Sequence, residues 1–156
     1  MNVLFATSEA RPYIASGGLA DVSGALPKAL CAAGTDCRVI LPLYSDIPQQ
    51  LRNEMTYLCN FNVRLSWREL YCGLFTARHD GVTYYFIDNE YYFRRSGIYG
   101  HYDDGERFAF FSKAVLESIL HIEDFSVDVL HCNDWQTGLI PVFLKSFSVM
   151  STGFPV

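Results

Sequence analysis

The chain has 156 residues, of which 50% are hydrophobic and 19% charged, and its formal net charge is −5. This length predicts one domain, over residues 1–156, with room for a buried core. Lysine and arginine are scattered, so a nucleic acid is not expected as a partner. No apolar run approaches the roughly 20 residues that cross a bilayer, and the first expected strand leaves no room for a signal peptide, so no membrane association is expected.

The cysteines indicate a reducing compartment. They are odd in number, lack C-x-x-C spacing and lie in apolar segments: Cys31, Cys37, Cys59, Cys72 and Cys132. Such residues are typical of buried free thiols, so a cytoplasmic protein is expected. The histidines have no metal-ligand spacing with them, and no metal site is predicted.

The first part of the chain predicts a βαβ unit. An apolar strand at residues 3–6 is followed by a helix, and Gly34 suits that helix's C-terminal end before a second strand at 37–42. The expected apolar face of the helix consists of Val22, Ala25, Leu26, Ala29 and Leu30. Such a unit implies parallel strands with a right-handed crossover.

The middle of the chain predicts antiparallel strands. Residues 56–65, 70–78 and 82–87 are rich in Tyr, Phe, Val and Thr, and Asp80-Gly81 between the last two is a hairpin signal. We expect an antiparallel excursion that returns to the main sheet through residues 84–87.

The last part alternates helices and strands again. A long aromatic and polar loop over 88–106 is typical of a functional segment. A helix is expected at 108–120, a buried strand at 127–131 and a further helix over 134–147. The helix at 108–120 should bury Phe108, Phe111, Val115, Leu116 and Ile119. The fold class predicted is α/β: a Rossmann-like, doubly wound, mostly parallel sheet with an antiparallel hairpin excursion.

Two segments are candidates for ligand binding. Gly17 and Gly18 lie between the first strand and helix, where backbone N–H groups can approach a phosphate. The pair can equally be a tight connection, and with the next glycine at position 24 the dinucleotide fingerprint is not met.

The second candidate is residues 131–137, where a strand ends, so both segments should share the carboxyl edge of the sheet. Asn133 or Asp134 can cap a helix or bind a ligand, and Trp135 can belong to the core or form a sugar platform. His131 is more typical of a structural histidine. Amides, carboxylates and aromatic rings at one edge suit a hydroxyl-rich ligand such as a carbohydrate.

Several stretches, in order along the chain, resemble bacterial glycogen synthases and plant starch synthases. They are residues 5–12, 16–22, 24–27, 39–42 with Tyr44, 103–108 and 131–139. The family moves glucose from ADP-glucose to the non-reducing end of an α-1,4-glucan with retention, between two Rossmann-like domains in the GT-B arrangement. The resemblance implies that this chain is part of the N-terminal domain, with donor and glucan as partners and no cofactor.

The resemblance also assigns roles to residues. The donor side would be formed by Ala15, Ser16, Gly17 and Gly18. The acceptor or sugar-binding side would be formed by Asp21, Tyr99, His101, Asn133, Asp134, Trp135 and Gln136.

Two departures from the family pattern matter. Ala15 stands where the family has a lysine that contacts the donor phosphates, and alanine cannot supply that charge. The family's active-site histidine and donor domain would lie beyond residue 156, so no catalytic residue is assigned and the chain alone is expected to be inactive.

Exposed apolar surface could make the chain self-associate. The alternative is a non-catalytic glucan- or phosphosugar-binding module.

Overall fold

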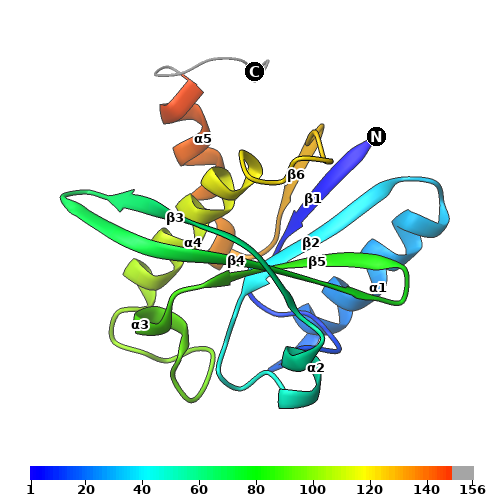
Figure 1. Cartoon of the computed structure of the whole chain (residues 1–156), viewed down its shortest axis with the longest axis horizontal. Helices are drawn as coiled ribbons and strands as arrows, with labels where there is room; N and C mark the ends of the chain where they lie inside the picture. The colour runs from blue at the N-terminus through cyan, green and yellow to red at the C-terminus, as the bar shows by residue number, and fades with distance from the viewer. Residues whose placement is uncertain (149–156) are drawn as a thin grey trace.

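The structure is a computed structural model that describes residues 1–148, so the predicted domain boundary at 156 lies outside the described residues. Figure 1 shows its elements, which in chain order are β1 (Asn2–Ala6), α1 (Gly18–Ala32), β2 (Asp36–Pro42), α2 (Gln49–Asn53), β3 (Thr56–Leu65), β4 (Arg68–His79), β5 (Val82–Asp88), α3 (Glu90–Phe93), α4 (Asp104–Ile119), β6 (Val129–Cys132), the 3-10 turn η1 (Trp135–Thr137) and α5 (Ile140–Ser148).

All described strands form a single six-stranded sheet in the order β3-β4-β5-β2-β1-β6. The pairs β1–β2, β1–β6 and β2–β5 are parallel, whereas β3–β4 and β4–β5 are antiparallel. The α/β fold prediction is therefore confirmed, including the antiparallel excursion and its return through β5.

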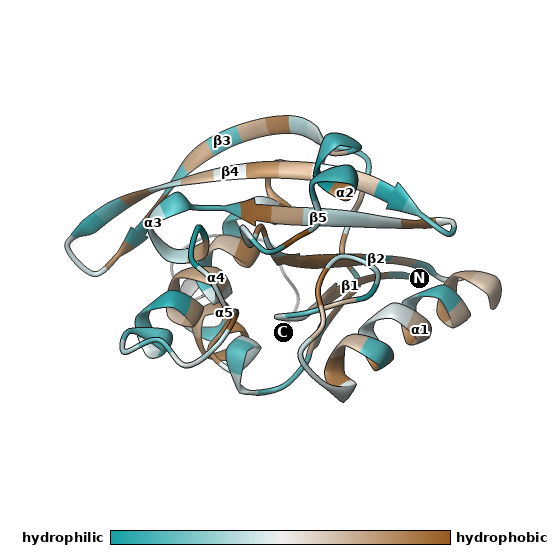
Figure 2. Ribbon diagram, turned by 90° about the horizontal axis from the view of Figure 1, so that it is seen from below, coloured by the Kyte–Doolittle hydropathy of each residue, from teal (hydrophilic) through white to brown (hydrophobic). Residues whose placement is uncertain are grey.

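The sheet is covered on both faces. Tyr13 packs against Tyr84 and Phe86 of β5 on the face that carries α1, with ring centroids 4.8 Å apart in each pair. On the other face, Arg38 donates to the Tyr85 hydroxyl at 2.7 Å and lies over the ring of Phe125, which follows α4. Consecutive residues of a strand point to opposite faces, so β5 buries aromatic and aliphatic side chains on both faces over residues 84–87. Figure 2 shows the hydrophobic colour concentrated in the central strands β1 and β2.

Helix α1 ends as predicted. Gly34 has φ of +89°, which favours glycine. The Gly34 N–H donates to the Cys31 carbonyl, and the Thr35 N–H donates to the Leu30 carbonyl, both at 3.0 Å. This pair of bonds is the Schellman motif, and it satisfies carbonyls that the helix leaves without partners.

The predicted apolar face of α1 is wrong. The fully buried residues are Ala20, Ser23 and Pro27, whereas Val22 is 49% and Leu26 37% exposed. Small side chains allow the helix to approach the sheet closely, and the Ser23 hydroxyl contacts that of Thr7 at 2.9 Å. The more hydrophobic stripe therefore faces away from the described sheet.

The hairpin prediction at Asp80-Gly81 is confirmed. These residues connect β4 to β5 and have φ of +48° and +81°. Two consecutive positive φ values are the requirement of a type I′ turn, whose twist matches that of the paired strands.

Three boundaries differ from the predictions after residue 100. Helix α4 begins at Asp104, earlier than expected, and β6 is a short edge strand with alternating exposure rather than a buried one. Asp134 has φ of +63°, which excludes it from a helix, so η1 forms first and α5 begins only at Ile140. Pro141 follows, in the first turn, where its missing N–H costs no hydrogen bond.

Candidate functional site

The two predicted ligand-binding segments follow the carboxyl ends of the neighbouring parallel strands β1 and β6. The N–H of Thr7, after β1, donates to the Ile40 carbonyl of β2 at 3.1 Å, and the N–H of Asn133, after β6, donates to the Ala6 carbonyl at 3.2 Å. These bonds continue the parallel ladder beyond its carboxyl ends. The expectation that both segments lie at this edge is therefore confirmed.

The glycine loop is held by Glu9, a residue that the sequence patterns did not single out. Glu9 is only 3% exposed. Its carboxylate accepts hydrogen bonds from the N–H of Ser16, from the N–H of Gly17 at 3.3 Å and from the Ser16 hydroxyl at 3.1 Å. Two backbone donors of the loop are thus directed at a protein carboxylate. Open N–H groups for a ligand begin at Gly18, where α1 starts without a side-chain cap.

Tyr99 joins the same carboxylate from the long loop. Its hydroxyl donates to Glu9 Oε1 at 3.1 Å and lies 2.6 Å from the Ser8 hydroxyl. Burial raises the pKa of Tyr99, and the nearby Glu9 charge adds to this shift while the Ser8 hydrogen bond opposes it. The phenol stays protonated at neutral pH, so it donates to Glu9 and accepts from Ser8.

An aromatic row connects Tyr99 to the segment after β6. Phe108 lies between them, with ring centroids 6.1 Å from Tyr99 and 5.2 Å from Trp135. Trp135 remains 55% exposed, and its backbone N–H donates to the Asp134 carboxylate at 2.6 Å. An open indole beside a carboxylate is an arrangement that can hold a sugar ring by stacking and hydrogen bonding.

Two predicted site residues lie in different surroundings from those expected of exposed ligand contacts. The Asn133 amide donates to the carbonyls of Ala6 at 2.9 Å and His131 at 3.3 Å, which ties β6 to β1 rather than capping a helix. Gln136 is buried, and its side-chain oxygen has no partner among residues 1–148. The sequence offered no means of distinguishing these environments.

Asp21 and His101 make their contacts elsewhere. Asp21 pairs with Arg11 at 2.5 Å and borders a cavity of about 350 Å³ between α1 and the β4–β5 turn, which Lys28 also lines. His101 contacts the Gly97 carbonyl of its own loop through Nε2 at 2.9 Å. These contacts do not connect either residue to the Glu9–Tyr99 pair.

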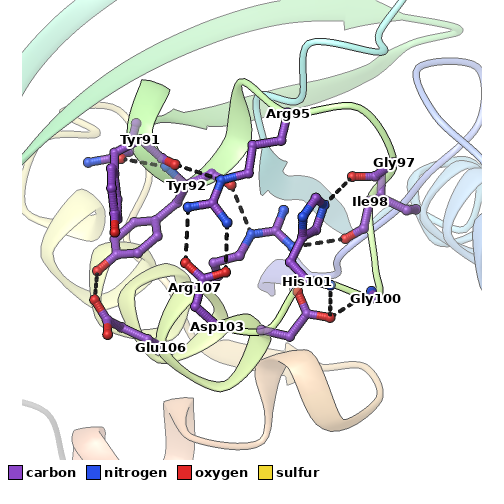
Figure 3. A network of polar contacts seen from close by, with 12 residues as sticks. Tyr91, Tyr92, Arg95, Gly97, Ile98, Gly100, His101, Asp103, Glu106 and Arg107 are labelled. Atoms are coloured by element: carbon purple, nitrogen blue, oxygen red, sulfur yellow. Dashed lines mark hydrogen bonds and ion pairs between the residues drawn. The ribbon is translucent and has the colours of Figure 1, made fainter.

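A buried arginine anchors the loop that carries Tyr99 (Figure 3). Arg107 of α4 is fully buried, and its guanidinium donates to the Tyr92 carbonyl at 2.8 Å, to the Ile98 carbonyl at 3.4 Å and to Asp104 at 2.5 Å. Arg95 and Asp103 add a two-bond ion pair at 2.6 and 2.9 Å. The loop is therefore fixed at several points on both sides of Tyr99.

The described residues contain no group of three or more His, Cys, Asp or Glu side chains placed to hold a metal ion. The cysteines, all within residues 1–148, are free thiols. Across the same range, every helix is too short or too polar to cross a membrane.

These features define an α/β protein of the Rossmann-like class. At the carboxyl ends of its parallel strands, side chains of a kind that can bind a carbohydrate lie at one edge of the sheet. The family model described as "Starch synthase catalytic domain" matches residues 2–154, and the chain belongs to this family.

Curated relatives agree with this assignment. A glycogen synthase of Clostridium novyi is 62% identical over 145 residues, which is 93% of this chain and 30% of that protein. A glycogen synthase of Caldicellulosiruptor saccharolyticus is 58% identical over 146 residues, which is 94% of this chain and 30% of that protein. The chain therefore spans less than a third of the length of these relatives.

A solved structure matches the fold as well. The catalytic domain of starch synthase IV from Arabidopsis thaliana, bound to ADP and acarbose, superposes with a TM-score of 0.84 at 29% identity. The match covers 95% of this chain and 31% of that one.

Proposed function

We propose that this chain is the N-terminal part of a glycogen synthase that transfers glucose from ADP-glucose to the non-reducing end of an α-1,4-glucan, with retention and without a cofactor. The observation that carries the proposal is the family match over residues 2–154, together with the 62% identity to a glycogen synthase. The starch synthase neighbour binds ADP and acarbose, ligands that correspond in kind to a nucleotide-sugar donor and a glucan. The whole enzyme would act in the cytoplasm.

On the donor side, Ala15, Ser16, Gly17 and Gly18 would approach the diphosphate. The exposed glycines allow close contact with a ligand, and the first N–H groups of α1 attract negative charge. Because the N–H groups of Ser16 and Gly17 are bound to Glu9, their role would be to shape the loop. Phosphate contacts would come from the N–H groups from Gly18 onward.

On the acceptor side, Tyr99, Asp134 and Trp135 would receive the glucan. The exposed Trp135 ring offers a stacking surface, and the Asp134 carboxylate can accept sugar hydroxyls. Asp21, His101, Asn133 and Gln136 are retained as proposed contacts, with Asp21 at the cavity beside α1. No residue of this chain is assigned to catalysis, because the family's active-site histidine would belong to the rest of the enzyme.

The test is a labelled-glucose transfer assay with the full-length enzyme and with the 156-residue chain alone. The full-length enzyme should move glucose from ADP-glucose to glycogen. β-Amylase should then release the label as maltose, because the new residue is α-1,4-linked at a non-reducing end. The 156-residue chain should transfer nothing above a no-protein control, and transfer by it would refute the proposed inactivity.

Parallel arms test the remaining parts of the proposal. UDP-glucose should be a poorer donor than ADP-glucose, and dialysis against a chelator should leave the rate unchanged. A full-length enzyme that binds maltoheptaose but never transfers glucose would instead support the non-catalytic glucan-binding module.

A further inference from the structure

We propose that Glu9 is a positioning residue that couples the donor loop to the acceptor side of the site through its two carboxylate oxygens. This inference rests on the proposed function. It assigns a role to a residue that lies outside both predicted ligand-binding segments and that touches neither proposed substrate.

The two carboxylate oxygens of Glu9 accept hydrogen bonds from different sets of donors. Oε2 accepts from the N–H groups of Ser16 and Gly17, so it fixes the backbone of the glycine loop. Oε1 accepts from the Ser16 hydroxyl and from Tyr99, both at 3.1 Å, so it links that loop to the long loop. One carboxylate therefore contacts both the glycine loop, seven and eight residues further along the chain, and Tyr99, 90 residues further along.

Because Glu9 is buried, these hydrogen bonds depend on the protein donors alone. Glu9 is 3% exposed, so water cannot readily replace a partner that moves away, and a buried carboxylate that loses a donor is destabilised. Tyr99 is itself fixed by Ser8 at 2.6 Å, and its loop is anchored by the buried Arg107. A displacement of the Tyr99 hydroxyl by a glucan would thus be transmitted to the N–H groups that precede α1.

The coupling predicts that a change at Tyr99 alters donor binding. Removing the Tyr99 hydroxyl leaves Oε1 with the Ser16 hydroxyl as its one remaining partner in the described structure, so the loop backbone relaxes around Glu9. Replacing the Glu9 carboxylate with an amide turns one acceptor into a donor that faces N–H groups. Both changes should raise the KM for ADP-glucose, although neither residue is proposed to touch the donor.

The experiment is a double-mutant cycle in the full-length enzyme with Glu9→Gln, Tyr99→Phe and the double variant. Each single variant should raise the KM for ADP-glucose and for glucan by about three- to tenfold, with kcat within about twofold. In the Glu9→Gln background, Tyr99→Phe should cause no further rise in the KM for ADP-glucose. Glu90→Gln, which changes an exposed carboxylate paired with Arg94, is the control and should leave both constants unchanged.

Independent effects would overturn the proposal: Tyr99→Phe raising the donor KM equally in both backgrounds, or raising only the glucan KM. If Glu9→Gln does not fold, the Tyr99→Phe result alone decides, because coupling requires it to change donor KM.

A binding measurement separates this inference from the proposed function. Calorimetric titration of ADP with and without maltoheptaose should show an affinity difference in the full-length protein that Tyr99→Phe abolishes, since coupling is reciprocal. An enzyme that transfers no glucose but shows this difference would contradict the proposed function and support the coupling. Unaltered ADP affinity with maltoheptaose would contradict the coupling.

Discussion

Asp104 and Arg107 form an ion pair inside the first turn of α4, with Oδ1 2.5 Å from Nη1 and the arginine side chain fully buried. The second oxygen of Asp104 accepts the N–H groups of Gly100 at 2.8 Å and His101 at 3.2 Å. A single carboxylate therefore neutralises a buried cation and holds the end of the loop that carries Tyr99.

We expect Asp104→Asn to be strongly destabilising. It preserves the shape of the side chain but removes the carboxylate that pairs with the buried Arg107 charge, and breaking a buried pair in this way costs about 3 kcal/mol. Urea unfolding followed by circular dichroism should show this loss. Asp80→Asn, which breaks the exposed pair with Lys28, is the matched control and should leave stability nearly unchanged. Equal losses in the two variants would contradict the importance of burial.

The pair of Arg95 and Asp103 gives a pH-dependent prediction. The two hydrogen bonds from Arg95 lower the pKa of Asp103 in the folded state below its ordinary value of about 3.9. The stabilisation is therefore complete above that value and is lost as the pH falls through the folded-state pKa. Asp103→Asn should lower the free energy of unfolding by about 1–2 kcal/mol at pH 7, and the difference from the parent should shrink in acid.

The check is a series of urea unfolding curves from pH 7 down to pH 3, with Glu90→Gln as the control because its pair with Arg94 is exposed. A stability difference for Asp103→Asn that stays constant, or grows, as the pH falls would contradict a lowered pKa for Asp103 in the folded state. The control should remain close to the parent at every pH.

The elements that could be predicted from sequence are those fixed by local chemistry. Asp80-Gly81 specifies its turn because its backbone φ values are set by those two residues, and Gly34 ends α1 for the same reason. The alternation of strand and helix patterns predicted the α/β fold class, although not the order of strands in the sheet. These features depend on neighbours in sequence, which are visible without the fold.

The features that could not be predicted depend on distant partners. Glu9 accepts hydrogen bonds from residues seven and ninety positions away, so no local sequence pattern shows that it holds the glycine loop. The buried face of α1 was misassigned because hydrophobic periodicity counts apolar side chains, whereas close packing on the sheet selected the small residues Ala20 and Ser23.

Ala15 leads to a gain-of-function prediction. This residue is exposed at the start of the glycine loop. The resemblance to glycogen and starch synthases implies that a lysine at this position would contact the donor phosphates. Ala15→Lys in the full-length enzyme should lower the KM for ADP-glucose by about fivefold, the equivalent of ~1 kcal/mol from a partly solvated charge pair. The effect should weaken as salt is raised, because salt screens such a pair.

Initial-rate kinetics at two salt concentrations test this effect. Ala15→Gln is the control, since it adds length without charge and should leave the donor KM near the parent value. An equal gain from glutamine would show that chain length, rather than charge, is what Ala15 lacks.

The exposed apolar stripe of α1 predicts association of the 156-residue chain. Val22 and Leu26 face away from the described sheet, and the edge strand β6 presents Val129 at 40% exposure. Exposed apolar surface and an open strand edge both favour contact with another chain. Sedimentation should therefore detect oligomers of this chain, and the double variant Val22→Ser with Leu26→Gln should weaken the association by about tenfold, as expected for removing apolar area from an interface.

Leu120→Gln is the matched control for the association experiment, because Leu120 is 75% exposed but lies beyond the end of α4. It should leave the sedimentation behaviour unchanged. If it weakens association as much as the α1 variant does, the contact is a general effect of surface hydrophobicity rather than a property of α1. A loss confined to the α1 variant would identify this helix face as the surface through which copies of the chain associate.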